Sequence, residues 1–504
     1  GSITSTGSFG DGRFAGNVGI GTVSPTAPIH IQHSALSGFD SHADDLLVIE
    51  RTGGVTSFNM AVDTDQTSYL MFSDTTRNVG SIAYFHDGDS MVFRVGAGTR
   101  MQLDSDSVIS LSNNDGNTSN TIFGKSAWQQ ASNVGADYNT IFGQEAMGAG
   151  NIGAAERNTG IGMAVMRSIT TGDSNVAVGS DTLYALTEGS NNIGVGRQAL
   201  AAVTTGNDNV AIGRAAGDAI TTESSTILIG RNAGGVLNST DAVGTVAVGD
   251  HSLSALTSGQ KTVAIGYEAM LYMTDGDNNT AVGHTAFRTA DNGESDNVVI
   301  GRAAGYSINH ASSDQNVIIG SAAGTGGAAE FSNNIEIGFA ALNSTGTNTV
   351  SGQIAIGTEA LTSLTSGEYN VAIGHQAMTT ETQGDRNTAV GYQALKDQNG
   401  VNGEVHNTAV GYLAGHNITT GKSNTLLGSE VGTSLTTASQ SICIGRTAGN
   451  TISTGNQNIA VGFGAISNAT TTGDNNIAVG ANAGNDLTSG YHNIFLEKQS
   501  QLDC

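Results

Sequence analysis

The stretch Asn387–Leu395, NTAVGYQAL, returns almost unchanged as NTAVGYLAG at Asn407–Gly415. Each position of a globular core meets a different environment, so a recurring phrase indicates a recurring environment. Aligned on the glycine of AVG, the phrase occurs 22 times up to Asn493–Glu497, at intervals of 17 to 20 residues and most often 17; the last copy has lost the glycine. Repeats of this length bury their apolar face only on their neighbours, and they predict a solenoid.

The columns of this alignment indicate what each repeat forms. Three residues before the glycine stands Val, Ile or Thr, one residue before it stands Ile, Val, Leu or Phe, and the residue between them is most often Ala. Alternation of this kind, rich in β-branched residues, predicts a short strand with one face in a core. We expect the Val and Ile columns to be the buried ones. Ala is common three residues after the glycine, and we expect two layers to come close there.

Two further columns predict the rest of the coil. Asn stands four residues before the glycine in 17 of the 22 copies, and side chains stacked at the strand spacing of about 4.8 Å can hydrogen-bond to each other as a ladder. A second glycine is common ten residues after the first, in turns such as Thr204–Gly206. Each copy is therefore expected to be one coil, made of a strand, a glycine corner, a second short strand and a turn.

Composition agrees with a continuous β-structure. The chain has 71 Gly and only two Pro, both before the array, and proline cannot donate to a strand ladder. The formal net charge of −25 excludes nucleic acid and anionic membrane surfaces as expected partners. No run of apolar residues is long enough to span a membrane. Cys443 occupies a strand position where Ala is usual, which predicts a small buried residue rather than a reactive thiol.

The residues before the array differ from it. Segments such as DDLLVIERTGG and GSIAYFHDGDSMVFRVGAG alternate apolar and polar residues between Gly and Asp turns, which predicts a small antiparallel β domain. The expected division is an N-terminal connector over residues 1–24, the antiparallel domain over 25–116, the solenoid over 117–497 and a tail over 498–504. The connector holds GNVGIGT, Gly16–Thr22, an isolated copy of the later phrase.

The stretches TSTGSFG, GNVGIGTVSPTAPIHI and VGSIAYFHDGDSMVFRVGAGTRMQLD resemble the shaft of tailed-bacteriophage tail fibres completed by an endosialidase-type, self-cleaving C-terminal chaperone. The NTAVGYQAL array is also similar to the β-roll heads of trimeric autotransporter adhesins. The resemblance implies a parallel homotrimer of β-rolls that joins other tail proteins in the virion and attaches to a host-surface receptor, expected to be a glycan. It also leads us to expect that the gene continues past Cys504 into such a chaperone and that Cys504 is the mature end.

The sequence leaves two alternatives open: a bacterial trimeric adhesion fibre at the cell surface, and a tailspike that depolymerises polysaccharide. Paired carboxylates cleave glycosidic bonds, but many Asp and Glu residues here lie in turns such as TTGDSN, where we expect them to be solvated. Metalloprotease, nucleophile-elbow and phosphate-loop motifs are missing, and the histidines lack metal-ligand spacing. We therefore expect a non-enzymatic fibre without catalytic residues, cofactor or metal, although Asp-bearing turns leave Ca²⁺ as a weaker alternative.

The residue directly after the corner glycine is the candidate for ligand binding. Basic and planar side chains gather in this column although the chain has only 19 Lys and Arg, and such groups stack on and hydrogen-bond to sugars or carboxylates. The alternative is that they pair with acids across the trimer seam or cap the corner. This column, the stripe, contains Arg197, Arg214, Arg231, Tyr267, His284, Arg302, His375, Tyr392, Tyr412 and Arg446.

Overall fold

The computed structural model describes residues 18–20, 29–32, 47–50, 60, 63–72, 80–96, 98–103, 109–110, 120–128, 135–147, 152–237, 243–291, 293–343, 346, 348–399 and 403–496. Within these ranges the chain forms strands and turns, and no helix. Contacts divide it into two compact units, Gly1–Ser110 and Leu111–Cys504, which are described separately.

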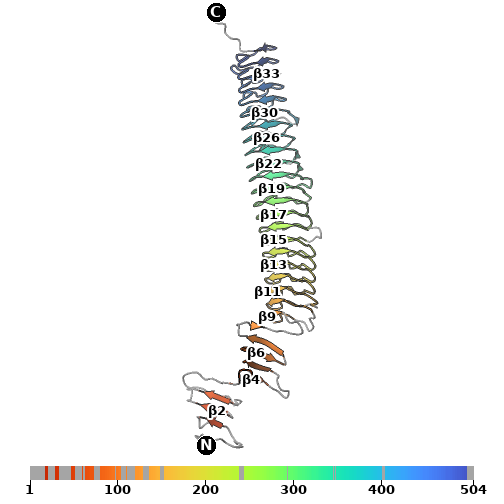
Figure 1. Ribbon diagram of the computed structural model, residues 1–504. Helices are drawn as coiled ribbons and strands as arrows, with labels where there is room; N and C mark the ends of the chain where they lie inside the picture. The colour runs from red at the N-terminus through yellow and green to blue at the C-terminus, as the bar shows by residue number, and fades with distance from the viewer. Residues whose placement is uncertain are drawn as a thin grey trace. The chain divides into compact units, whose positions relative to one another are not determined.

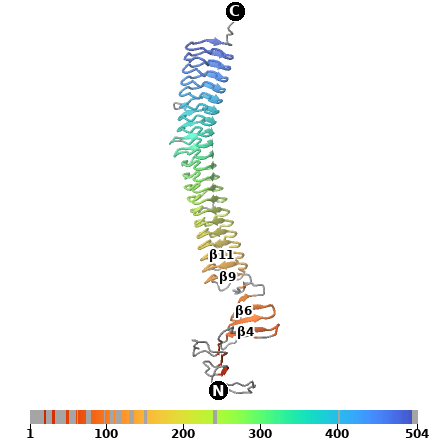
Figure 2. The ribbon, with the colours of Figure 1, turned by 90° about the vertical axis from the view of Figure 1, so that its left-hand side faces the viewer.

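The second unit is a parallel β-solenoid. It contains a ladder of 22 strands, each paired with the strand of the next coil, which makes about 21 turns. Figures 1 and 2 show the coils stacked in chain order. The strands are β9 (Thr121–Phe123), β10 (Thr140–Phe142), β11 (Thr159–Ile161), β12 (Val176–Val178), β13 (Ile193–Val195), β14 (Val210–Ile212), β15 (Ile227–Ile229), β16 (Val246–Val248), β17 (Val263–Ile265), β18 (Thr280–Val282), β19 (Val298–Ile300), β20 (Val317–Ile319), β22 (Ile335–Ile337), β24 (Ile354–Ile356), β26 (Val371–Ile373), β28 (Thr388–Val390), β30 (Thr408–Val410), β31 (Thr425–Leu427), β32 (Ile442–Ile444), β33 (Ile459–Val461), β34 (Ile477–Val479) and β35 (Ile494–Phe495). The predicted all-β solenoid is confirmed.

The corner glycine is required by the close approach of successive coils. Gly266 has a φ of 139°, and a Cβ added to it would lie 2.2 Å from the carbonyl oxygen of Gly283 in the next coil. Gly283 itself has a φ of 146° and meets the carbonyl oxygen of Gly301 in the same way, at 2.3 Å. A side chain at this position would therefore push the backbones of two coils apart.

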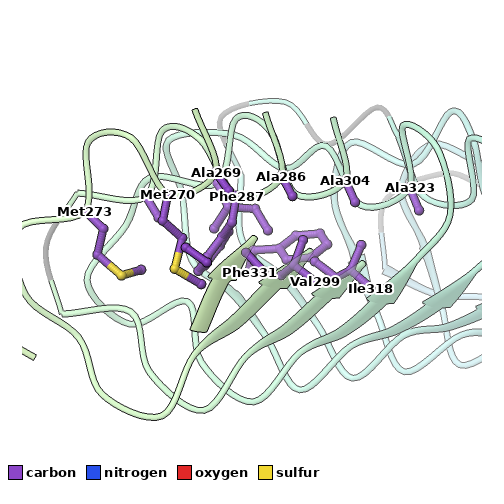
Figure 3. Packing of buried hydrophobic residues seen from close by; sticks show 14 of the residues in the cluster. Ala269, Met270, Met273, Ala286, Phe287, Val299, Ala304, Ile318, Ala323 and Phe331 are labelled. Carbon is purple, nitrogen blue, oxygen red and sulfur yellow. The ribbon is translucent and has the colours of Figure 1, made fainter. Parts of the chain in front are cut away.

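The strand faces are oriented opposite to our expectation. In β17 the middle residue, Ala264, is fully buried, whereas Ile265 is 39% exposed and Val263 is half-buried. The Ala column therefore lines the core, and the Val and Ile columns form the outer surface of the sheet. The expectation was wrong because period-two alternation separates two faces without saying which of them points inward. The alanines three residues after the glycine do lie at a close approach of two layers, as predicted: Ala269, Ala286, Ala304 and Ala323 line the turn layer, opposite Val299 and Ile318 of the strand layer (Figure 3).

Side-chain size is exchanged between two positions across the core. We number positions from the corner glycine, so the middle strand residue is position −2, and the residue four after the glycine is position +4. Ten of the 22 coils combine a small −2 residue with a large +4 residue, as in Ala281 and Phe287, both fully buried. Several coils with a large −2 residue have glycine at +4, as in Leu228 and Gly234, where an added Cβ would lie 2.8 Å from Leu228 Cδ2. Coils such as that of Ile141 and Met147 have large residues at both positions. In the first two kinds of coil the core volume therefore stays filled although the position of the large side chain differs.

The Asn column, at position −4, forms the predicted ladder. The Asn175 Nδ2 atom donates to the Asn158 Oδ1 atom at 3.0 Å and to the carbonyl oxygen of Gly189 at 2.9 Å, and the Asn175 backbone N–H donates to the same Oδ1 at 2.9 Å. Asn192 repeats these contacts one coil later. Both ends of each amide are satisfied inside the chain, so this column stabilises the stack and is not available to a ligand.

The prediction of a second short strand directly after the glycine is wrong. Positions +2 and +4 have left-handed backbone conformations even without glycine, as at Glu268 (φ 51°) and Met270 (φ 50°), and a strand cannot contain such residues. The segment is instead a run of turns that hydrogen-bonds to the next coil. Within the described residues, second strands occur only before the main strand, in five coils: β21 (Phe331–Ser332), β23 (Val350–Ser351), β25 (Gly367–Glu368), β27 (Gly384–Asp385) and β29 (Gly403–Glu404).

The first unit contains two separate sheets. β4 (Thr67–Phe72), β5 (Gly80–Phe85), β6 (Ser90–Val95), β7 (Gly98–Leu103) and β8 (Ile109–Ser110) pair antiparallel, which confirms the small antiparallel domain. β1 (Val18–Ile20), β2 (Ile29–Gln32) and β3 (Leu47–Glu50) instead form a parallel sheet. The predicted antiparallel domain over 25–116 includes the second and third of these strands. The assignment failed because apolar and polar residues alternate equally in parallel and antiparallel strands.

Candidate binding surface

The stripe, at position +1, lies in successive coils, but its residues do not form one site. Asp250, Ser321, Phe339 and Thr358 occupy the same position in intervening coils and divide the stripe into groups. Each group holds three neighbouring coils, except Arg446, which Ser429 separates from Tyr412 and which stands beside Phe463. A ligand on this column would therefore meet short clusters rather than a continuous surface.

The aromatic members of the stripe stack on one another. The rings of Tyr267 and His284 lie 5.1 Å apart between centroids and 22° apart in plane. His375, Tyr392 and Tyr412 form a three-ring stack with centroid distances of 5.4 Å and interplanar angles of 11° and 15°. Their faces are covered by neighbouring rings, so the edges and the tyrosine hydroxyl groups are what a ligand would contact. Stacking of a sugar on these rings is open only at the ends of each stack.

The cations of the stripe have different partners. The Arg231 Nη2 atom donates to Asp250 Oδ2 at 2.9 Å, and this hydrogen bond lowers the pKa of the Asp250 carboxyl. The Arg446 guanidinium lies 5.2 Å from the centroid of the Phe463 ring. Arg197 and Arg302 have no side-chain hydrogen bond or ion pair within the described ranges. Pairing with acids therefore occurs inside one chain for Arg231, and it needs no trimer seam.

Sequence reasoning missed a second group of residues, at positions +2 and +5. The Arg167 Nη1 atom donates to the Tyr184 hydroxyl at 3.2 Å, its guanidinium lies 5.9 Å from the Tyr184 ring centroid, and its Nη2 atom lies 3.5 Å from Glu145 Oε2. Glu145, Arg167 and Tyr184 belong to three successive coils. The available signal was the 17-residue spacing of Arg167 and Tyr184 at position +5, which is visible only after aligning a column that has no dominant residue type.

The same arrangement occurs again seven coils later, in a tighter form. The Arg288 Nε atom donates to Glu268 Oε2 at 2.7 Å, and this hydrogen bond lowers the pKa of Glu268. Arg288 also lies 4.9 Å from the ring centroid of Tyr272 and 5.8 Å from that of Tyr306. Here the charged groups are paired directly with each other. In the first arrangement they are held apart.

A hollow lies at the first arrangement, where the Arg167 Nη2 and Glu145 Oε2 atoms are 3.5 Å apart. It has a volume of about 500 Å³ and is lined by Gln144, Glu145, Met163, Ala164, Arg167, Asp181, Tyr184, Gln198 and Ala201. These residues come from positions +1, +2 and +5 of four successive coils. A smaller hollow of about 390 Å³, lined by Leu413, His416, Asn417, Glu430, Thr433 and Asn450, lies mainly between the same two columns, +2 and +5, near the other end of the ladder. A groove between the +2 and +5 columns is therefore a recurring feature of the turn layer.

The buried acids of the array are not accessible to a substrate. Burial raises the pKa of Glu294 to about 7 and that of Glu336 well above its usual range, and both residues have no exposed surface. Cys443 is also buried, as predicted, and burial raises the pKa of its thiol to about 12. Within the described ranges no group of three or more His, Cys, Asp or Glu side chains is placed to hold a metal ion.

Comparison with family models, with curated proteins and with solved structures finds no match to this chain. In the part of the chain that the structure describes, no helix is long and apolar enough to cross a bilayer.

Proposed function

We propose that this protein is a structural and receptor-binding tail fibre of a tailed bacteriophage, which attaches the virion to a glycan on the host cell surface. The observation that carries the proposal is the uninterrupted sequence of coils that displays outward side chains in columns. Such an array presents a long surface to a partner, as solenoids generally do. The acidic chain, with a net charge of −25, fits a partner that is neither nucleic acid nor an anionic membrane surface.

The fibre assembles as a parallel homotrimer in this proposal. The support is the outer face of the sheet, where apolar side chains such as Ile212 (40% exposed) and Leu427 (48% exposed) repeat along the ladder. Monomeric proteins seldom expose a contiguous apolar patch larger than roughly 300–600 Å². Copies of the same chain have the same strand spacing, so their faces match over the full length of the ladder.

Light scattering of the native protein tests the assembly. We expect a mass of three times 51.0 kDa, and a mass of 51.0 kDa would overturn the trimer. Replacing Ile212 and Ile265 by Glu places charges on the outer face of the sheet and is expected to separate the chains. Ser429→Glu, at a stripe position on the turn layer, serves as the control and should leave the mass unchanged.

Attachment is tested with the full chain carrying a fluorescent label. The labelled protein is incubated with a panel of bacterial cells, half of each sample having been treated with periodate, which cleaves the vicinal diols of surface sugars. We expect saturable binding to at least one member of the panel and its loss after periodate. Binding that periodate does not change would overturn the glycan receptor, and binding to no member would overturn the attachment function.

A further inference from the structure

The 500 Å³ hollow has the composition and size of a small-ligand site. Ligand pockets generally have volumes of about 300–1,000 Å³ and combine apolar walls with a few directed polar groups. Here Met163, Ala164 and Ala201 supply apolar surface, and Tyr184 supplies a ring. The polar groups are carboxylates, amides and a guanidinium.

The hollow exists because two small residues interrupt its columns. Position +2 reads Glu145, Ala164, Asp181 in successive coils, so the alanine leaves a gap between two carboxylates. At position +5, Tyr184 is followed by Ala201 in the next coil, and the small Ala201 side chain leaves the hollow open on that side. In the arrangement around Arg288 the cation closes directly on its carboxylate.

The polar groups of the hollow are only partly used within the chain. The Arg167 Nη2 atom lies 3.5 Å from the Glu145 Oε2 atom, which is longer than a normal charged hydrogen bond, whereas the matching Arg288–Glu268 distance is 2.7 Å. Asp181 accepts one hydrogen bond, at Oδ2 from the Ser180 hydroxyl at 2.9 Å. The guanidinium, the two carboxylates and the Gln198 amide therefore have donors and acceptors left for a ligand.

The charge of the lining decides the class of ligand. Glu145 and Asp181 carry two negative charges and Arg167 one positive charge, which gives a formal charge of −1 and disfavours an anionic ligand. Carboxylates accept hydrogen bonds from hydroxyl groups, amides both accept and donate, and an aromatic ring covers the apolar face of a pyranose. A neutral sugar ring matches all of these groups.

The hollow also stays open in the proposed trimer. The alanines of the turn layer face the strand residues across the core (Figure 3), so the outward side chains of the two layers point to opposite sides of the coil. The hollow belongs to the turn layer, and the apolar face that we assign to assembly belongs to the strand layer.

We propose that this hollow binds a neutral hexose or N-acetylhexosamine residue of the host glycan. This assignment rests on the proposed attachment function and gives it a ligand class and a location. Glu145, Asp181 and Gln198 hold the sugar hydroxyls, Arg167 donates to a ring or glycosidic oxygen, and Tyr184 covers one face of the ring. A single shallow subsite of this kind binds on the order of 1 mM, and three copies in one fibre raise the effective affinity by multivalency.

The test uses saturation-transfer difference NMR on the full chain with the methyl glycosides of glucose, galactose, mannose, N-acetylglucosamine and N-acetylgalactosamine, and with glucuronate as the anionic probe. We expect at least one neutral glycoside to bind and glucuronate to bind at least tenfold more weakly. Ala164→Gln fills the hollow, and its backbone suits Gln because Gln198 has the same left-handed conformation in its own coil (φ 54° and 62°). We expect this variant to weaken glycoside binding at least tenfold.

Two further variants keep the test decisive. Asp181→Asn removes one acceptor charge without changing size and is expected to weaken the neutral glycoside at least threefold. Arg288→Met disrupts the tighter arrangement and should leave glycoside binding unchanged, with circular dichroism confirming the fold of every variant. The assignment is overturned if no neutral glycoside binds, if glucuronate binds best, or if Ala164→Gln binds like the parent. Periodate-sensitive cell binding that survives Ala164→Gln would overturn the hollow alone, whereas glycoside binding without cell binding would overturn the attachment function alone.

Discussion

Replacing Leu426 by Ala should destabilise the coils around β31 strongly, and a second substitution should recover part of the loss. Leu426 is fully buried at position −2, and the +4 residues beside it are Gly415 and Gly432. Cβ atoms added to these glycines would lie 2.7 Å and 3.0 Å from the Leu426 side chain, so that side chain fills the space on both sides. Neither glycine has a side chain that can move into the cavity.

The expected cost is therefore at the upper end of the range for buried leucines. Leu→Ala substitutions in cores cost about 2–5 kcal/mol, rising with the volume left empty, and we expect about 3–5 kcal/mol for Leu426→Ala. Gly432→Leu alone should cost about 2–4 kcal/mol, because it overpacks the core and places a branched residue in a left-handed conformation. Most coils already have a large residue at this position, such as Leu395 at a φ of 48°, so the backbone accepts it.

The double variant recreates the common arrangement of a small −2 and a large +4 residue. We expect it to cost about 2–4 kcal/mol, well below the combined cost of the single changes, since the new leucine occupies the emptied space. The gap beside Gly415 stays open, so recovery is partial. The expected coupling is at least about 2 kcal/mol.

Hydrogen–deuterium exchange read by mass spectrometry measures this locally. Peptides from β30 to β32 report the free energy of opening of the affected coils, and peptides from β14 to β17 are an internal control, since a repeat contacts only its neighbours. If the loss of stability of the double variant equals the sum of the two single losses to within about 0.5 kcal/mol, the −2 and +4 side chains do not compensate for each other.

Three further predictions follow from other parts of the ladder. Gly283→Ala places a Cβ 2.3 Å from the carbonyl oxygen of Gly301, so we expect a loss of about 3 kcal/mol or more, read as faster amide exchange in both coils; parent-like exchange would contradict the close approach. Both carboxylate oxygens of Glu336 are buried without a hydrogen-bond partner, and burial raises the pKa of this residue. The stability that protonated Glu336 contributes is therefore fully present below the unfolded pKa of about 4.3 and is lost as the pH rises above that value. Glu336→Met should therefore raise stability by about 1–3 kcal/mol at pH 8 and less at pH 4, measured by thermal unfolding, and an equal gain at both pH values would argue against ionisation as the cause. Arg214→Ala combined with Arg231→Ala should weaken attachment to cells at low salt while leaving the unfolding temperature unchanged, since these side chains lie at the surface; a lower unfolding temperature with unchanged attachment would assign the stripe to structure instead.

The features that could be predicted from the sequence are those that the backbone imposes on every coil. A corner where coils touch admits only glycine, and a stacked amide is matched by a hydrogen-bonding side chain in the next coil, most often another Asn, so both features appear as columns. The strand ladder follows from the same regularity. These features gave the fold class and the Asn ladder directly.

The features that could not be predicted depend on differences between coils or on symmetric patterns. Alternation does not show which face of a strand points into the core, and the prediction that the Val and Ile face is buried was therefore wrong. Left-handed backbone at Glu268 or Met270 has no sequence signature, because neither residue type favours it. The hollow depends on Ala164 and Ala201 standing beside larger residues, and an alignment that looks for what repeats passes over such exceptions.

Because every coil repeats the pairing of its neighbour, the insertion or deletion of whole coils in the gene would change the length of the solenoid in fixed steps. Duplicating or removing the 17 residues between Gly374 and Gly391 would restore the same glycine contact, the same amide pair and the same strand pairing. Each step changes the reach of the ladder by about 4.8 Å. Such a change leaves the packing intact only where one coil supplies both the small −2 residue and the large +4 residue, as with Ala389 and Leu395. The coils around Leu426 share one large side chain between two glycines, and they would have to be gained or lost together.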